Sequence, residues 1–166
     1  LWTVPNSFAA SANCALRCGA EVDFVDIDPV TRNMDVGQLA DRLAAADRAG
    51  RLPRIVVPVD FSGLPIDIGA IRQLADRYGF KVIEDASHAT GARYLDGPVG
   101  SGFADISVFS FHAVKTVTTG EGGMCTTADP ALAQTLRRLR THGITRDPAE
   151  MREAAEGPWS YEQLEL

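Results

Sequence analysis

The sequence predicts an α/β fold in which a mainly parallel sheet carries helices on both faces. Short apolar segments alternate with segments of helical periodicity along most of the chain, a pattern typical of βαβ units. The apolar segments are nearly continuous rather than alternating, as expected for strands that are covered on both sides. In such sheets, ligands bind at the carboxyl ends of the strands, so the residues that follow each strand are the first candidates for a site.

Five segments have the composition of strands. Each is a short, largely apolar run bounded by polar, acidic or glycine-rich residues, which favours a strand over a helix. The first three alternate with helices, and this order predicts parallel pairing. The predicted strands are VDFVDID (22–28), RIVVPVDF (54–61), FKVIED (80–85), DISVFSF (105–111) and GGMCTTAD (122–129).

Three segments have apolar residues at helical spacing together with residues suited to helix ends. Asp35 is a predicted N-cap and Gly50 a stop for the first helix, and Gly79 is a predicted C-cap for the second. Asp129 is the predicted N-cap of the third helix, with Pro130 at its first position. The predicted helices span residues 35–50, 65–79 and 129–143.

The composition excludes several classes of protein. The 166 residues have a formal net charge of −6, which disfavours nucleic acid or an anionic membrane as a partner, since both attract basic surfaces. No apolar run approaches the length of a membrane span, and the chain does not start with a signal peptide. The length suits one compact core. We therefore expect a globular protein of the cytoplasm.

The three cysteines predict neither a disulfide framework nor a metal site. An odd count without a secretory signal indicates a reducing compartment. Cys14 and Cys18 lie on one face of a possible helix, but two thiols without further ligands nearby make a poor zinc site. We expect the cysteines to be small buried apolar residues.

Lys115 is the residue that most suggests chemistry. The chain contains only one other lysine, Lys81, which follows a glycine at a helix end and opens a strand, as a solvated charge does. Lys115 instead comes four residues after an apolar strand and is flanked by Val114 and Val117. Burial there would favour the neutral amine that Schiff-base chemistry requires.

Further polar residues follow the same strands, and each also has a purely structural interpretation. Asp85 ends one strand, where a carboxylate serves either a cap or a ligand. His88 is a lone histidine, which is more often structural than a ligand. The segment TTGEGG (118–123) favours a tight turn over a phosphate cradle, because it matches neither nucleotide motif. A carboxylate, a hydroxyl and a buried lysine at strand ends together suggest pyridoxal phosphate (PLP).

Longer motifs carry a resemblance to a known family. The segments EDASHATGARY, GSGFADISVFSFHAVKTVTTGEGG and LRRLRTHGITRD resemble, in order and spacing, the sugar aminotransferases of the DegT/DnrJ/EryC1/StrS family. The resemblance extends over nearly the whole chain from VPNSFAASANCA onward. It implies the type I aminotransferase fold and PLP as the cofactor.

The resemblance also implies a role for individual residues. Lys115 matches the lysine that bonds covalently to the cofactor and moves the proton, and Asp85 matches the partner of the pyridinium nitrogen. Ser110 matches a phosphate ligand, and Phe8 matches an aromatic residue that stacks on the cofactor ring. His88 occupies a place where the family has His or Gln near the phenolic oxygen. His112 is left without a role, and Ser7 stands where threonine is common.

Within the family, the resemblance implies L-glutamate as the amino donor and a UDP-linked, N-acetylated 4-keto-6-deoxy sugar as the acceptor, in a pathway to pseudaminic acid. A GDP-linked 4-keto sugar is the alternative acceptor, and a catalytically inactive fragment is a further alternative. Lys115 argues against the related dehydratases, in which histidine replaces the lysine. A plain nucleotide-binding module is also open, although no glycine motif supports it.

The ends of the sequence suggest part of a longer protein. The chain starts at LWTVPNSF without methionine and stops at YEQLEL without a cap. Together with the resemblance, this predicts that residues 1–166 are the central part of a PLP-binding large domain, without the family's N-terminal segment and small C-terminal domain. We expect the complete protein to be a homodimer.

Overall fold

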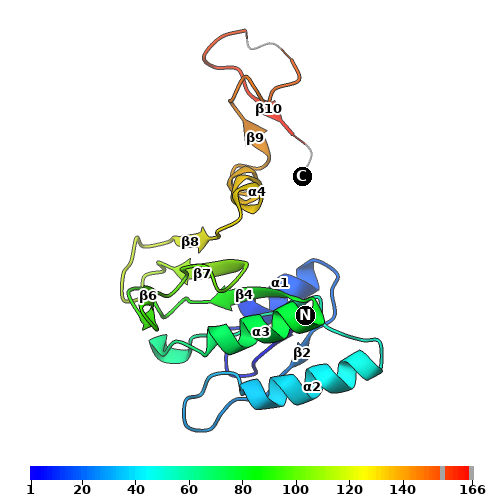
Figure 1. Ribbon diagram of the computed structural model, residues 1–166. Coiled ribbons are helices and arrows are strands. Elements are labelled where there is room, and N and C mark those ends of the chain that lie inside the picture. The colour runs from blue at the N-terminus through cyan, green and yellow to red at the C-terminus, as the bar shows by residue number, and fades with distance from the viewer. Residues whose placement is uncertain (154–155, 165–166) are drawn as a thin grey trace. The chain divides into compact units, whose positions relative to one another are not determined.

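The computed structural model describes residues 1–153 and 156–164, and the chain divides into two compact units, Leu1–Ala128 and Asp129–Leu166 (Figure 1). The first unit contains a six-stranded sheet with the strand order β2-β1-β3-β4-β7-β8. All neighbours pair in parallel except β7 and β8, which are antiparallel. The predicted α/β fold with a mainly parallel sheet is therefore confirmed.

The strands at the centre of the sheet match the predicted ranges, and the earlier ones are shorter. Pro58 has no N–H to donate and interrupts the predicted strand 54–61, which meets β4 again at a parallel bridge between Val59 and Asp85. Beyond 24, the predicted strand 22–28 leaves the sheet, and Ile27 forms an antiparallel bridge with Met34. The strands are β1 (Trp2–Thr3), β2 (Asp23–Phe24), β3 (Ile55–Val56), β4 (Lys81–Asp85), β7 (Ile106–Ser110) and β8 (Gly123–Thr126), with β5 (Arg93–Tyr94) and β6 (Gly97–Pro98) forming a separate hairpin.

The two predicted helices of this unit form with the caps that the sequence indicates. Helix α2 (Val36–Arg48) begins at Asp35, whose side chain accepts a hydrogen bond from the Gln38 N–H. Helix α3 (Ile68–Tyr78) begins at Asp67 and ends at Gly79, which adopts the left-handed conformation with φ 79°. Two helical elements lie outside the three predicted helices: α1 (Ala10–Arg17), where the cysteine spacing had indicated only a possible helix, and the 3₁₀ turn η1 (Phe61–Gly63).

Alternation along β4 separates the two faces of the sheet. Val82 and Glu84 are buried on one face, against the core formed with α2 and α3. Asp85 points to the other face, where it contacts α1. Figure 1 shows α2 and α3 together on one side of the sheet and α1 behind it, so helices lie on both faces as predicted.

The main hydrophobic core lies under α2 and α3. Its residues come from both helices and from the facing side of the strands, so the periodicities of helix and strand meet in one layer. The largest fully buried apolar side chains are Phe80, Leu39, Leu43, Ile71, Val25, Val56 and Val82.

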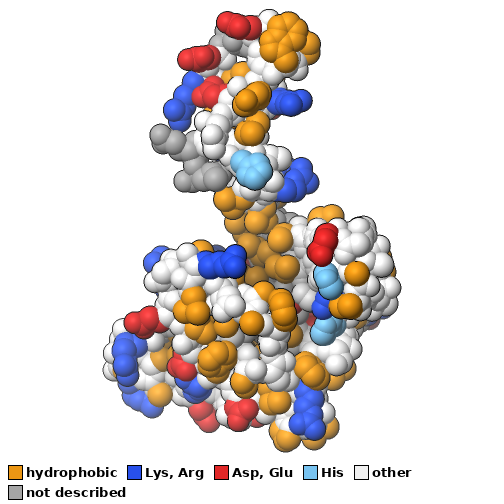
Figure 2. Space-filling view, turned by 180° about the vertical axis from the view of Figure 1, so that it is seen from behind, with side chains coloured by type: hydrophobic (Ala, Val, Ile, Leu, Met, Phe, Trp, Pro, Cys, Tyr) orange, Lys and Arg blue, Asp and Glu red, His pale blue; other side chains and the backbone are white. Residues whose placement is uncertain are grey.

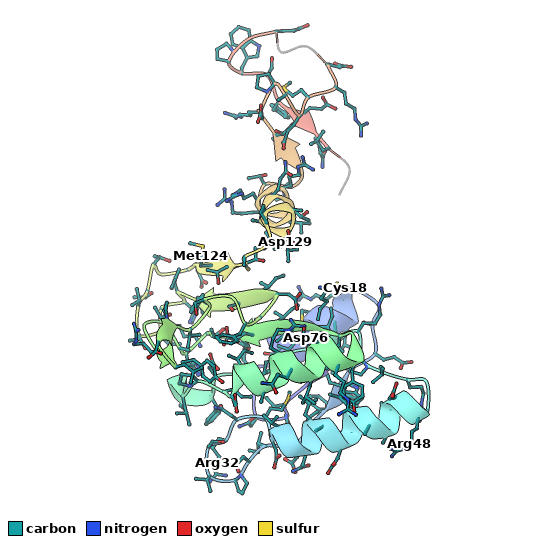
Figure 3. The ribbon with its side chains drawn as sticks, in the orientation of Figure 1. Cys18, Arg32, Arg48, Asp76, Met124 and Asp129 are labelled. Atoms are coloured by element: carbon teal, nitrogen blue, oxygen red, sulfur yellow. The ribbon has the colours of Figure 1, made fainter. Side chains whose placement is uncertain are left out.

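The expectation that the cysteines are buried is wrong: Cys14, Cys18 and Cys125 are all exposed. Helix α1 buries Ser11 and Ala15 instead, whereas Cys14 and Cys18 line an open groove (Cys18 is labelled in Figure 3). Cys125 lies on β8, the last strand of the sheet, where partial burial raises the pKa of its thiol.

The second unit contains the predicted C-terminal helix. Helix α4 (Pro130–Arg140) begins at Asp129, whose side chain accepts from the N–H groups of residues 131 and 132. A short antiparallel pair, β9 (Ile144–Thr145) and β10 (Glu162–Gln163), follows. Glu150 accepts hydrogen bonds from Arg138 at 2.8 Å and from Thr145 at 2.9 Å, and these contacts lower its pKa. They tie the loop before β10 to α4.

Among the helices that the structure describes, none combines the length and the apolar character needed to cross a membrane.

The left-handed cap at Gly79 generates a stability prediction. We expect Gly79→Ala to lower the free energy of unfolding by about 1–2 kcal/mol, because an L side chain disfavours positive φ. An added Cβ would meet no atom within 4 Å, so the effect is conformational rather than steric. Gly79→Asn should lower the free energy of unfolding by less, since asparagine tolerates this conformation. Urea unfolding measures all three chains, and an alanine variant at least as stable as the asparagine variant would contradict the assignment.

Candidate functional site

The candidate site lies where β4 and β7 end. These strands are parallel neighbours, with Asp85 paired to Val108, so their carboxyl ends meet at one edge of the sheet. Ser110 is two residues beyond Val108 and therefore projects from the same face as Asp85. The structure thus brings two of the sequence-predicted residues to one face and one edge.

Asp85 is held by hydrogen bonds to both side-chain oxygens and to its backbone. Its Oδ2 accepts from the Ser11 Oγ at 2.7 Å, and its Oδ1 accepts from the Ser87 N–H at 3.2 Å. Its N–H donates to the Pro58 carbonyl, and its own carbonyl accepts from the Asp60 N–H. The carboxylate is half-buried and is fixed in orientation by groups from three segments of the chain.

Helix α1 supplies a residue that the sequence analysis missed. Ser11 is 8% exposed, and its Oγ lies 2.8 Å from the Ser7 Oγ as well as next to Asp85. Ser7, Ser11 and the neighbouring Phe8 all belong to the segment PNSFAAS. The i, i+4 spacing of the two serines was visible in the sequence, but their proximity to Asp85 was not, because 74 residues separate Ser11 from Asp85.

Lys115 lies in a loop, residues 111–122, that is closed at its base. The Phe111 N–H donates to the Gly122 carbonyl, and the Phe111 carbonyl accepts from the Thr119 N–H, each at 2.9 Å. Within the loop, the Lys115 N–H donates to the His112 carbonyl at 2.9 Å. The segment TTGEGG therefore forms the returning arm of a longer loop and the start of β8, rather than a tight turn of its own.

The two lysines differ in their partners. The Lys81 amine lies 2.9 Å from Asp105, which also binds Arg72 at 3.0 Å. The Lys115 amine makes no hydrogen bond or ion pair within the part of the chain that the structure describes. Lys115 is half-buried rather than enclosed, because Val114 and Val117 are 79% and 51% exposed and do not form the expected apolar wall.

The remaining predicted residues are on the surface near these strand ends. Phe8 is 83% exposed and precedes α1, and His88 is exposed in the turn after β4. His112 is exposed, and its Nε2 lies 3.8 Å from Glu121 across the base of the 111–122 loop. Figure 2 shows histidine side chains gathered with basic and acidic ones on one side of the first unit. These exposed groups form an open surface rather than an enclosed pocket.

Two buried acids lie behind Asp85. Burial raises the pKa of Asp60 to about 7, with the negative charges of Glu84 and Asp85 adding to the shift and the Ile66 N–H opposing it. The Oδ2 of Asp60 is buried and has no hydrogen-bond partner among the described residues. Burial also raises the pKa of Glu84, although Ser107 donates to it at 2.5 Å. Three acids therefore lie together at this end of the sheet, and burial favours the neutral forms of Asp60 and Glu84.

The site residues fit the chemistry of PLP. The cofactor needs an amine that is free to bond, a carboxylate for its ring nitrogen and donors for its phosphate. Lys115 has an unpaired amine within the described structure, Asp85 is an anchored carboxylate with hydrogen-bonding capacity left, and Ser110 offers a hydroxyl on the same face. The chain therefore carries the groups of such a site at adjacent strand ends.

A large groove lies elsewhere on the first unit. Its volume is about 1310 Å³, and its lining comes from the start of the sheet and from α1 and α2, including Cys14, Cys18, Arg42, Lys81 and Ile83. None of the predicted site residues lines it. The chemistry of the strand ends, rather than the size of the hollow, therefore identifies the site.

Comparison with known proteins assigns the same family as the motifs do. The chain matches the model of the DegT/DnrJ/EryC1/StrS aminotransferase family over residues 2–158. It is 42% identical over 144 residues to the UDP-4-amino-4,6-dideoxy-N-acetyl-beta-L-altrosamine transaminase of Campylobacter jejuni, a match that covers 87% of this chain and 37% of that protein.

Solved structures of similar proteins superpose on the chain. Helicobacter pylori PseC, an aminotransferase involved in the biosynthesis of pseudoaminic acid, matches with a TM-score of 0.80 and 32% identity, over 93% of this chain and 40% of that one. DesI, determined in the presence of its TDP-sugar product, matches with a TM-score of 0.76 and 35% identity, over 89% of this chain and 36% of that one. The chain thus spans about two fifths of the length of these proteins.

The buried Asp60 generates a pH prediction. Its pKa is about 7 in the folded state against an ordinary value of 3.8, so between these values the folded protein binds a proton that the unfolded chain lacks. Stability therefore falls as pH rises from about 4 to 7, by up to about 4 kcal/mol from this residue. Asp60→Asn should abolish the loss of stability that this residue causes between these pH values, whereas the exposed control Asp41→Asn should show the same loss as the parent.

Urea unfolding at pH 5 and pH 8 measures the effect. An Asp60→Asn variant that loses as much stability between these pH values as the parent would show that Asp60 is not the titrating group.

Proposed function

The chain belongs to the DegT/DnrJ/EryC1/StrS aminotransferase family, and from this premise we propose that its protein is a PLP-dependent enzyme that transfers an amino group from L-glutamate to a nucleotide-linked 4-keto-6-deoxy sugar. The observation that carries the proposal is the arrangement of Lys115, with its unpaired amine, in the loop that follows β7, beside the strand that ends at Asp85. The names of the similar proteins support a sugar as the acceptor.

Each site residue has a proposed part in this reaction. When bound, PLP supplies an electron sink for the carbon that gains or loses the amino group. Lys115 would hold the cofactor covalently and carry the proton to and from that carbon. Asp85 would keep a proton on the ring nitrogen, and Ser110 would donate to the phosphate. Phe8, exposed beside α1, would stack on the ring, while His88 would lie near its phenolic oxygen.

We propose a UDP-linked, N-acetylated sugar in pseudaminic acid biosynthesis as the acceptor. The Campylobacter transaminase named for such a sugar supports it at 42% identity. DesI has a TDP-sugar as its product, so the nucleotide varies among similar proteins. We also propose that residues 1–166 belong to the cofactor-binding large domain, that the complete protein is a homodimer and that it works in the cytoplasm.

The acceptor is tested with matched substrates on the full-length gene product. We expect kcat/KM to be at least tenfold higher for a UDP-linked 4-keto-6-deoxy N-acetyl sugar than for GDP- or TDP-linked 4-keto sugars, because one lost hydrogen-bonding contact changes the ratio by about that factor. A preference for the GDP-linked sugar would overturn the UDP assignment and retain the transaminase.

The lysine is tested by trapping. The full-length gene product is incubated with PLP and reduced with borohydride, and the labelled peptides are mapped by mass spectrometry. We expect label on Lys115 and little on Lys81, because the Lys81 amine is held in an ion pair with Asp105. Lys115→Ala should lose the label, and the matched control Lys81→Arg should keep it.

The same experiment separates an enzyme from an inactive chain. A saturable visible absorbance band on adding PLP accompanies a formed site, and an inert protein gives none. Equal labelling of both lysines, or no labelling of either, would overturn the proposed role of Lys115.

A further inference from the structure

Two serines of the N-terminal segment are connected to Asp85 by hydrogen bonds. The Ser11 Oγ lies 2.7 Å from the Asp85 Oδ2, and the Ser7 Oγ lies 2.8 Å from the Ser11 Oγ. Ser11 is 8% exposed, so water does not readily replace its contact with Asp85. A buried hydroxyl next to a carboxylate forms a hydrogen bond that is stronger than one between neutral groups.

The number of protons gives this chain of groups a direction. An ionised carboxylate only accepts hydrogen bonds, so Ser11 must donate to Asp85. A hydroxyl has a single proton, and Ser11 has then used its own. Ser7 must therefore be the donor in the contact with Ser11. The two hydrogen bonds therefore run in one direction: Ser7 donates to Ser11, and Ser11 donates to Asp85.

The surroundings of Asp85 explain why such donors matter. Asp60, which follows β3, and Glu84 on β4 lie nearby, and the negative charges of Glu84 and Asp85 add to the burial that raises the pKa of Asp60. The donors to the Asp85 side chain are the Ser11 hydroxyl from α1 and the Ser87 N–H from the turn after β4. Together these two donors fix the orientation of the Asp85 carboxylate.

We propose that Ser11, supported by Ser7, is a positioning residue for the reaction, which holds the Asp85 carboxylate oriented toward the ring nitrogen of PLP. The proposal rests on the proposed function, because it assigns Asp85 to that nitrogen. Ser11 itself does not touch the cofactor. Its effect passes through the Asp85 Oδ2, which it anchors, while Ser87 anchors the Oδ1.

The cofactor provides the decisive test, with the full-length gene product as the protein. Ser11→Ala should weaken PLP binding about tenfold, the effect of removing one hydrogen bond to a charged group. Ser11→Thr keeps the hydroxyl and should bind within about twofold of the parent, and Ser7→Ala should fall between the two. The exposed Ser101→Ala is the matched control and should bind as the parent does.

A cofactor analogue distinguishes positioning from a general structural effect. 1-Deazapyridoxal phosphate has carbon in place of the ring nitrogen, so Asp85 has no partner on it. Ser11→Ala should therefore leave the affinity for this analogue within about twofold of the parent. Equal weakening of both ligands would show that Ser11 only supports the fold, and would overturn the proposal.

A measurement without cofactor tests the hydrogen bond itself. The urea midpoints of Ser11→Ala, Asp85→Ala and the double variant form a double-mutant cycle. We expect the double variant to lose clearly less than the sum of the single losses, because each single change already breaks the same contact. Additive losses would overturn the serine chain. Non-additive losses in a protein that binds no PLP would instead overturn the role of Asp85 in the proposed function.

Discussion

The alternation of side chains along β4 is the constraint on which both the core and the candidate site depend. This strand is paired in parallel with β3 on one side and with β7 on the other, and this pairing fixes which side chains point to each face of the sheet. Val82 and Glu84 project into the core under α2 and α3, and Asp85 projects to the opposite face. A shift of one residue in the register would exchange these faces, burying Asp85 in the core. The packing of the core therefore also sets the direction of the site carboxylate.

Parallel pairing then brings several strand ends to the same edge. Asp60 follows β3, Asp85 ends β4 and Ser110 ends β7, so three segments distant in sequence deliver polar groups to one place. Burying acids there is unfavourable, and burial is the main cause of the raised pKa values of Asp60 and Glu84. The Ser107 hydroxyl opposes the shift of Glu84, and Ser11 and Ser87 donate to Asp85.

Two local structures complete this edge without belonging to the regular sheet. Helix α1 carries Ser11 and follows directly after Phe8, while the closed 111–122 loop carries Lys115. The loop is held at its base by backbone hydrogen bonds and leaves the lysine amine unpaired among the described residues. A site of this kind combines an anchored carboxylate on a strand with an amine on a more accessible loop. The accessible loop suits the lysine, because its amine must both bond to the cofactor and move a proton.

Local patterns in the sequence were sufficient for much of the fold. The caps at Asp35, Gly79 and Asp129 act through neighbouring residues, so the helix ends follow from the sequence. The central strands β4 and β7 follow likewise from their continuous apolar composition. Asp85, Ser110 and Lys115 could be selected because residues after strands of a parallel sheet share one edge.

Only the tertiary structure decided the contacts between distant segments. The Ser11–Asp85 hydrogen bond joins positions 74 residues apart, and nothing in either local pattern specifies it. The burial of Asp60 and the exposure of the cysteines depend on which surfaces the packing of distant segments covers. The predicted strand 54–61 is interrupted at Pro58 and meets β4 again at Val59, a contact that its local pattern does not specify. Composition and periodicity thus determined the elements and the candidate residues, whereas packing determined their environments.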